Sequence, residues 1–259
     1  MSSGNSSSLS FGESSSTARN SSNRDHQPPI FKLVKRSRWM KLRRILKSKR
    51  GFDRCQERDE TGLTLLGAAL GYHAPLDIIE LIITVDPNQL TAVDAFGANA
   101  LHLACLNGAP SASVACILKK CDELASSRDK DHRAPLHHAT ECICRDEIEF
   151  IEGLKVIEVL CRYDPTMIHA QDRSENSPLD LVHIVRTKDD LSELESKRLV
   201  KLSWFLRKIS FRVHRKQKKA WEESQSKHWP EEDIFSDSKR PLRKSAHTDS
   251  TMSLSASSR

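Results

Sequence analysis

The chain has 259 residues, of which 37% are hydrophobic and 29% charged, and its formal net charge is +6. No apolar run reaches 18 residues and the first residues are Ser-rich, so we expect neither a membrane-spanning helix nor a secretory signal. Seven cysteines, an odd number, favour reduced thiols in an intracellular protein, cytoplasmic or nuclear, over a disulfide framework.

Both ends of the chain are predicted to be disordered tails, at residues 1–27 and 223–259. The first is dominated by Ser, Gly and Asn, and Leu9 and Phe11 are the only large apolar residues between Ser2 and Asn23. The second is rich in Pro, Ser and mixed charge. Such segments bury too little apolar surface to offset the entropy lost on ordering.

Charge is separated along the chain. Residues 1–50 carry 12 Lys/Arg against 2 Asp/Glu, residues 59–185 carry 9 against 20, and residues 186–259 carry 18 against 11. An acidic middle therefore lies between two basic flanks.

An internal repeat is the main signal in the sequence. An eleven-residue segment beginning with aspartate recurs at Asp59 (DETGLTLLGAA), Asp94 (DAFGANALHLA), Asp129 (DKDHRAPLHHA) and Asp172 (DRSENSPLDLV). The leading aspartates are 35, 35 and 43 residues apart. Apolar blocks of helical spacing follow the first three copies, at residues 78–83, 114–118 and 156–160.

The repeated segment resembles the ankyrin repeat family, whose units read Asp-x-x-Gly-x-Thr-Pro-Leu-His-x-Ala. The matching positions are Gly62, Thr64, Leu66, Gly97, Leu101, His102, Ala104, Pro135, Leu136, His137, Ala139, Pro178 and Leu179. The resemblance implies an all-α repeat solenoid, a stack of helix–turn–helix units with short β-turn fingers, atypical helical caps and disordered termini. Its units would span residues 59–93, 94–128, 129–171 and 172–190.

The residues of each unit suit packing. Asp can bond its own backbone in a turn, and Gly can adopt positive φ. Proline fits the first helical position, and we expect Pro75 and Pro110 to begin second helices in that way. The sequence departs from the family pattern at His132 and Glu175, which replace the turn glycine, at Gly67 and Asp180, which replace the motif histidine, and at about eight extra residues around 142–152.

Helical segments on either side are predicted to close the stack, because a single helix pair cannot bury its own apolar face. Residues 28–58 would form a basic capping half repeat, and residues 191–222 a basic capping helix. Both segments carry large apolar residues at helical spacing. The folded region is then about 28–222.

No catalytic motif is present, so we expect a protein that is not an enzyme and needs no cofactor, metal or small-molecule substrate. The sequence has no nucleophile elbow and no phosphate-binding loop. The resemblance gives His102 and His137 a structural role, bonding backbone between turns. Cys142 and Cys144 lie ~200° apart around a helix. With His137 and His138 they are therefore interpreted as core residues and not as a metal site.

The resemblance implies protein binding through the turn tips and the exposed side of the first helices, so we predict a scaffold or adaptor. The turn positions are Glu60, Thr61, Leu63, Ala95, Phe96, Ala98, Lys130, Asp131, Arg133, Arg173, Ser174 and Asn176, and the helix positions are Tyr72, Leu106, Asn107 and Glu141. Phe96 is the first choice because interface hot spots favour large rigid side chains, although its ring could instead fold onto the next turn.

The basic flanks support an alternative function. Residues 32–50 hold ten Lys/Arg and no acidic residue, and residues 207–219 follow Trp204 and Phe205 with a similar basic pattern. Such helices bind anionic membranes, calmodulin-like proteins or nucleic acid, or are merely solvated caps; the same tracts could be nuclear import signals. Ser210 and Ser245 each follow a basic pair, as in short kinase motifs.

Overall fold

The computed structural model describes residues 29–188 and 191–226, and all regular structure in these ranges is helical. The chain divides into two compact units, the first ending at Val213 and the second beginning at His214. Of the predicted tails, residues 1–27 and 227–259 lie outside the described residues. Residues 223–226, which were assigned to the second tail, are helical and belong to α11 (Glu193–Ser226). No described helix has the length and hydrophobicity needed to cross a membrane.

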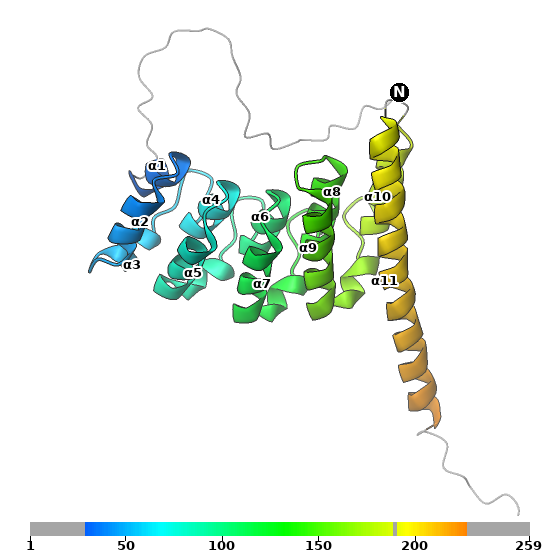
Figure 1. Cartoon of the computed structure of the whole chain (residues 1–259). Coiled ribbons are helices and arrows are strands. Elements are labelled where there is room, and N and C mark those ends of the chain that lie inside the picture. The colour runs from blue at the N-terminus through cyan, green and yellow to red at the C-terminus, as the bar shows by residue number, and fades with distance from the viewer. Residues whose placement is uncertain (1–28, 189–190, 227–259) are drawn as a thin grey trace, which may run out of the picture. The chain divides into compact units, whose positions relative to one another are not determined.

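The first unit is a stack of antiparallel helix pairs (Figure 1). The pairs are α4 (Leu65–Gly71) with α5 (Leu76–Val85), α6 (Ala100–Leu106) with α7 (Ser111–Lys120), and α8 (Pro135–Cys144) with α9 (Phe150–Tyr163). A short 3₁₀ helix follows each pair: η1 (Pro87–Leu90), η2 (Asp122–Ser126) and η3 (Pro165–His169). The last repeat contributes α10 (Pro178–Arg186).

Side chains cap the N-termini of the first helices of the repeats. The Thr64 hydroxyl accepts the N–H of Gly67 at 2.9 Å, and the Asn99 side chain accepts two N–H groups at the start of α6. Pro178 occupies the first position of α10 as predicted. The prediction for Pro75 and Pro110 is wrong by one residue, because both lie at the N-cap with extended ψ angles. An extended residue cannot be the first helical one, so these helices begin just after it.

One continuous apolar core runs through the stack. The motif leucines Leu66, Leu101 and Leu136 are essentially inaccessible, as are Ile82 and Ile117 of the second helices. The small residues Ala69, Ala104 and Ala139 lie where neighbouring first helices pack together. Burial of a leucine or isoleucine is worth about 1.5–3 kcal/mol, so the repeats stabilise one another through this seam.

The extra residues of the third repeat lengthen both of its helices. α8 has 10 residues where α4 and α6 have 7, and α9 has 14 where α5 and α7 have 10. The connection at 145–149 is one residue longer than its counterparts. The insertion therefore adds about one turn to each helix, and the apolar core of the third repeat stays continuous with that of its neighbours.

The basic segment near the start of the chain is divided into short helices, α1 (Pro29–Lys35), α2 (Trp39–Leu46) and α3 (Gly51–Cys55). Ser37, which has a φ of 51°, separates α1 from α2. α1 packs on α2 and α4, and α2 packs on α5. Two helix faces, instead of one, are thereby buried against the first repeat.

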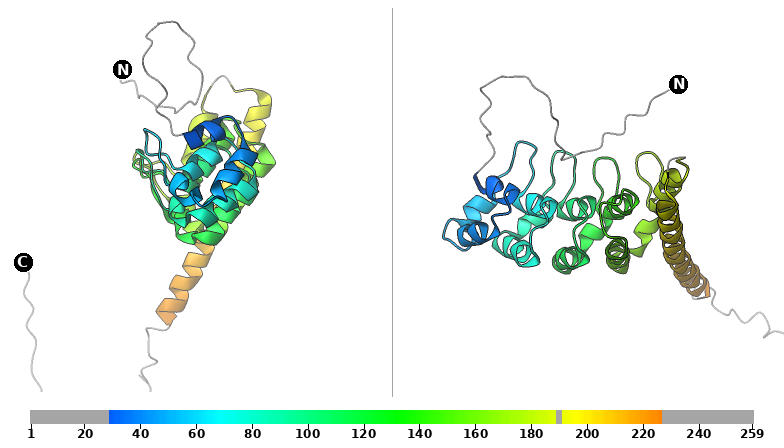
Figure 2. Two further views of the ribbon diagram at one scale, coloured as in Figure 1. Left: turned by 90° about the vertical axis from the view of Figure 1, so that its left-hand side faces the viewer. Right: turned by 45° about the horizontal axis from the view of Figure 1, so that its top comes forward.

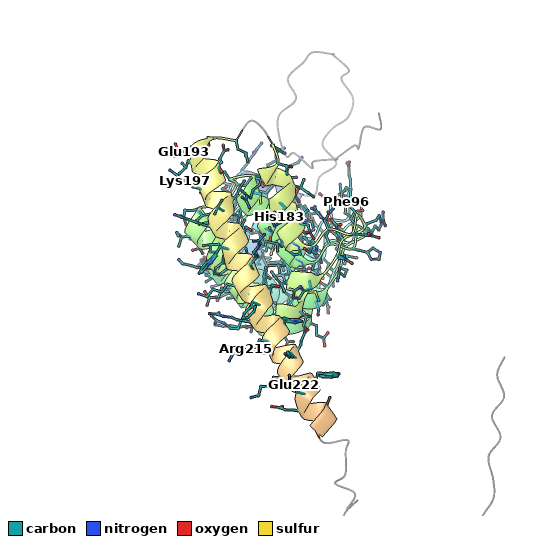
Figure 3. The ribbon with its side chains drawn as sticks, turned by 90° about the vertical axis from the view of Figure 1, so that its right-hand side faces the viewer. Phe96, His183, Glu193, Lys197, Arg215 and Glu222 are labelled. Carbon is teal, nitrogen blue, oxygen red and sulfur yellow. The ribbon has the colours of Figure 1, made fainter. Side chains whose placement is uncertain are left out.

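The long helix α11 (Glu193–Ser226) follows α10. In the first unit it buries Leu199, Leu202, Leu206 and Val213. Arg207 lies 3.1 Å from the ring of His183 on α10, which Figure 3 labels. Arg198 pairs with Asp146 and lies over the ring of Phe150. In the second unit, residues 214–224 are exposed and carry two intrahelical ion pairs, Lys218–Glu222 and Lys219–Glu223.

Candidate protein-binding surface

Each repeat begins with a finger, a tight turn shaped by the leading aspartate. One carboxylate oxygen accepts the N–H groups two and four residues further on, at 2.8 and 2.9 Å for Asp94 and at 2.9 Å for both bonds of Asp129. Asp59 and Asp172 make the same pair of bonds. A carboxylate is the right acceptor because it can take several donors at once.

The fourth position of every finger has positive φ. Gly62 and Gly97 both have φ of 78°, and the residues that replace glycine adopt the same region, with φ of 59° at His132 and 62° at Glu175. The four fingers therefore share one backbone shape despite the sequence departures.

Backbone hydrogen bonds join each finger to the next. The N–H of Ala95 donates to the Thr61 carbonyl at 3.0 Å, that of Lys130 to Phe96 at 3.0 Å, and that of Arg173 to Asp131 at 2.8 Å. Figure 2 shows the fingers gathered on one side of the helices. The fingers consequently form one connected row whose tips keep a fixed spacing.

Two buried histidines, His102 and His137, each attach a first helix to the finger of the next repeat. In the second repeat, the N–H of Asn99 donates to Nδ1 of His102, and Nε2 of His102 lies 3.1 Å from the Arg133 carbonyl. His137 bonds Ala134 and Asn176 in the same way. Because Nδ1 accepts, Nε2 carries the proton and donates to the carbonyl. Burial lowers the pKa of both rings, that of His102 to about 4 with help from His138.

This combination of finger, histidine and paired helices recurs at fixed intervals, and residues 65–172 match the family model for ankyrin repeats (3 copies). The chain carries ankyrin repeats. A comparison with curated proteins finds no match. The resemblance seen in the motif is thus confirmed, as is the all-helical fold of the described residues.

The ankyrin fingers expose most of the predicted turn residues. Those with exposed side chains are Glu60, Thr61, Ala95, Phe96, Lys130, Asp131, Arg173 and Ser174, while Leu63, Arg133 and Asn176 are partly buried. Ala98 differs: only 8% of it is exposed, because Asp94 folds its backbone beneath the turn. Its side chain is therefore not available to a partner.

The predicted helix positions lie at the ends of the first ankyrin helices. Tyr72 is the C-cap of α4 and is exposed, whereas Leu106 and its neighbour Asn107, the C-cap of α6, are partly buried. Asn107 is engaged by its own helix, since its amide donates to the Leu103 carbonyl at 2.8 Å. Glu141 belongs to the longer helix α8. These residues come from successive first helices of the stack.

Phe96 has the geometry expected of an anchor. Its side chain is 49% exposed at the tip of the second finger, and Figure 3 shows it on the finger side of the stack. Its own N–H bonds Asp94 and its carbonyl accepts from Lys130, so both backbone groups are held. The ring therefore stands on a fixed backbone, half in solvent.

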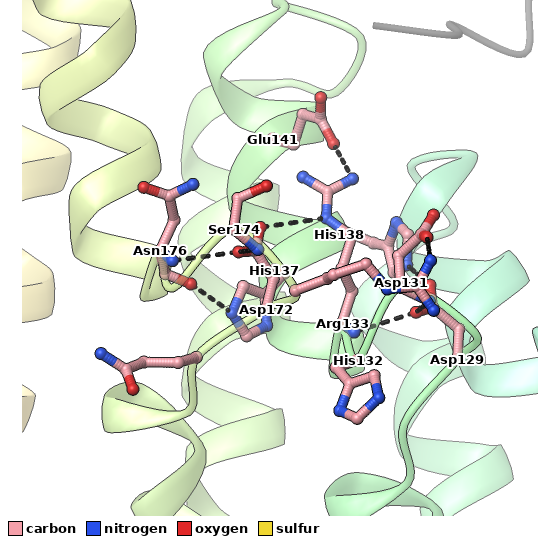
Figure 4. A network of polar contacts seen from close by, with 12 residues as sticks. Asp129, Asp131, His132, Arg133, His137, His138, Glu141, Asp172, Ser174 and Asn176 are labelled. Atoms are coloured by element: carbon pink, nitrogen blue, oxygen red, sulfur yellow. Dashed lines mark hydrogen bonds and ion pairs between the residues drawn. The ribbon is translucent and has the colours of Figure 1, made fainter.

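Arg133 links the third and fourth fingers through a polar network (Figure 4). Its guanidinium lies 2.8 Å from Glu141 and 3.8 Å from Asp172, and Glu141 also pairs with Arg145. Arg133 and Glu141 were predicted as contact residues, and the structure engages both in internal bonds. A partner would meet this network as a pre-ordered polar surface.

The sequence interpretation missed a second role for His138. Its Nε2 lies 2.8 Å from Oδ2 of Asp129, and its ring meets that of His102 edge-on with centroids 5.7 Å apart. Burial opposes ionisation of Asp129, but bonds from His138 and the Arg133 backbone outweigh it and hold the pKa of Asp129 to about 2. The pair of adjacent histidines at 137–138 was the sequence signal for this contact. Of the two rings, that of His138 bonds the finger aspartate, Asp129.

The described cysteines are free and at least partly buried. Burial raises the pKa of Cys142 and Cys144 to about 12, so both remain thiols at neutral pH. Within residues 29–188 and 191–226 no cluster of three or more His, Cys, Asp or Glu side chains is arranged to hold a metal ion.

The two predicted basic segments expose most of their charged side chains. On α2 and α11 most Lys and Arg side chains are exposed, as are Met40, Trp204 and Phe211. Ser210 is partly buried within α11, and its hydroxyl lies 3.4 Å from the ring of His169. Ser245 lies outside the described residues.

Proposed function

We propose that this chain is a non-enzymatic scaffold or adaptor that holds a protein partner on its row of ankyrin fingers. The observation that carries the proposal is the exposed Phe96 ring on a row fixed by backbone bonds between fingers. A preformed surface loses little conformational entropy when a partner binds, so more of the contact energy appears as affinity.

We infer the kind of partner surface from the chemistry of the finger tips. Glu60 and Asp131 provide negative charge, and Lys130 and Arg173 positive charge, around the single large apolar tip, Phe96. Lys130 and Arg173 also reach back to carbonyl groups of the preceding finger, at 2.7 and 2.6 Å. We therefore expect a partner with an apolar pocket for one aromatic ring and a rim of mixed charge, the usual arrangement of a protein interface.

The experiment compares the full chain with Phe96→Ala in affinity capture followed by quantitative mass spectrometry. Loss of a central aromatic anchor costs about 2–4 kcal/mol, so the true partner should fall at least tenfold in recovery. The melting temperature should stay within about a degree, because the half-exposed ring adds little to the core. The matched control is Ile151→Ala, an equally exposed apolar residue on α9.

Two outcomes would contradict the proposal. If every captured protein is retained by Phe96→Ala and by a joint change of Lys130 and Arg173 to Ser, the finger row is not the binding surface. If Phe96→Ala instead lowers the melting temperature strongly and leaves binding intact, Phe96 belongs to the scaffold.

A further inference from the structure

The outward face of α11 carries an apolar stripe that nothing in the first unit covers. Leu199, Leu202 and Leu206 point into the stack, whereas Val200, Trp204 and Phe211 are 47%, 63% and 69% exposed. At 100° per residue the three exposed side chains lie within about 40° of one another around the helix axis. Large aromatic rings in water contribute little to folding, so this stripe requires another explanation.

Lysines flank the same stripe. Lys197, Lys201 and Lys208 fall on this side of the helix, and the ammonium of Lys208 lies 4.9 Å from the Trp204 ring centroid. The Lys197 ammonium lies 2.5 Å from the Glu193 carboxylate, and Figure 3 labels both residues. Residues 196–213 contain six Lys/Arg and no acidic residue. Within the described residues, no ion pair engages Lys201 or Lys208.

We propose that this face, Val200, Trp204 and Phe211 with Lys197, Lys201 and Lys208, docks on an anionic lipid bilayer. Exposed rings on the convex side of a helix would need a deep, matching pocket in a protein. The bilayer interface accepts them without such a match, and tryptophan favours the headgroup region. The lysines provide the charge complement, since each basic residue near an anionic surface adds to the attraction.

The negative charge of the repeats limits the orientation in which the molecule can approach an anionic bilayer. Residues 59–185 carry 20 Asp/Glu against 9 Lys/Arg, so the side of the repeats would be repelled by anionic lipid. α11 follows α10 at the end of the stack. Contact through α11 therefore places the end of the stack, and not the length of the acidic repeats, against the bilayer, and salt screens repulsion from acidic charges that lie beyond ~10 Å. This inference is independent of the finger row, which lies on another side of the repeats.

The first test is co-sedimentation of the full chain with vesicles of phosphatidylcholine containing about 30% phosphatidylserine, in about 0.1 M salt. We expect binding that disappears with pure phosphatidylcholine and weakens as salt is added. Lys201→Glu with Lys208→Glu should weaken it at least about tenfold, and so should Trp204→Ser with Phe211→Ser. Lys119→Glu with Lys120→Glu, a matched charge reversal on exposed positions of α7, should have much less effect.

The second test asks whether Trp204 enters the lipid. In a chain carrying Trp39→Phe, Trp221→Phe and Trp229→Phe, Trp204 is the sole tryptophan. Its fluorescence should shift to the blue on anionic vesicles and be quenched by brominated lipid.

Several results would overturn the proposal. One is unchanged vesicle binding in the α11 variants, or its loss instead in Lys41→Glu with Arg44→Glu on α2. Another is binding without quenching of Trp204. A third is an absence of vesicle binding together with salt-sensitive binding of nucleic acid or an acidic peptide. Circular dichroism of each variant, compared with the parent chain, separates these outcomes from misfolding.

Discussion

The fourth position of each finger has a positive φ, a backbone conformation that residues other than glycine adopt only at a cost in free energy. His132 and Glu175 have φ of 59° and 62°, in the left-handed region where a Cβ costs about 1–2 kcal/mol. In the first two fingers the residue with positive φ is a glycine, Gly62 or Gly97. The third and fourth repeats therefore store backbone strain that the finger bonds of Asp129 and Asp172 must offset.

Replacing the strained residues should stabilise the chain. We expect His132→Gly and Glu175→Gly each to raise the free energy of unfolding by roughly 0.5–1 kcal/mol, after the flexibility of glycine in the unfolded chain is deducted. Urea denaturation followed by circular dichroism measures the change. Gly62→Ala is the reverse control: a methyl group there meets no atom closer than 3.9 Å, so its destabilisation reports φ alone. A loss of stability in both glycine variants would contradict this account.

At the scale of elements, the lengthened third repeat provides a cap for its neighbour. Pro110, the N-cap of α7, has no side-chain acceptor, and the N–H and hydroxyl of Ser111 donate instead to Glu152 at 2.8 and 2.6 Å. Glu152 lies in the first turn of α9, within the extra residues. The hydrogen bonds from Ser111, supported by Lys155, lower the pKa of Glu152 to about 2. The extra turn thus has a structural use.

Glu152→Ala should lower the free energy of unfolding by about 1 kcal/mol, the usual cost of losing an N-cap acceptor. Glu158→Ala, which removes an exposed carboxylate of α9 that pairs with Arg162, should change it by less than about 0.5 kcal/mol. Denaturation midpoints of the two variants provide the comparison. Equal effects would show that the contact with Ser111 adds nothing to stability.

At the scale of the whole molecule, the buried histidines make the stack sensitive to acid. His102 has its pKa lowered from 6.5 to about 4, chiefly by burial, and burial also lowers that of His137. Between these values the unfolded chain binds protons that the folded chain excludes. Stability is therefore complete above pH 6.5 and falls as the pH is lowered toward 4, by roughly 2–3 kcal/mol for His102.

Urea midpoints measured between pH 7.5 and pH 4 should show this decline. His102→Gln should flatten the curve, whereas His214→Gln, a change at an exposed position, should leave its slope unaltered. A steeper or unchanged slope in His102→Gln would mean that the acid sensitivity arises elsewhere. Because His102 and His137 each bond the following repeat, we expect the stack to lose its cooperativity over the same pH range.

The sequence by itself determined the local and periodic features: the register of the repeats, the aspartate-led fingers and, through the family resemblance, the histidine bonds, whereas the exposure of the Phe96 ring was left open. These follow from contacts within a few residues, or from a motif that repeats at a fixed interval. The tertiary structure decided the rest: the break at Ser37, the cap that Glu152 gives to Ser111, the pair of His138 with Asp129, and the side of α11 that faces water. Glu152 and Ser111 are 41 residues apart. The face of α11 depends on which leucines the last repeat leaves room to bury, and no periodicity within one helix contains that information.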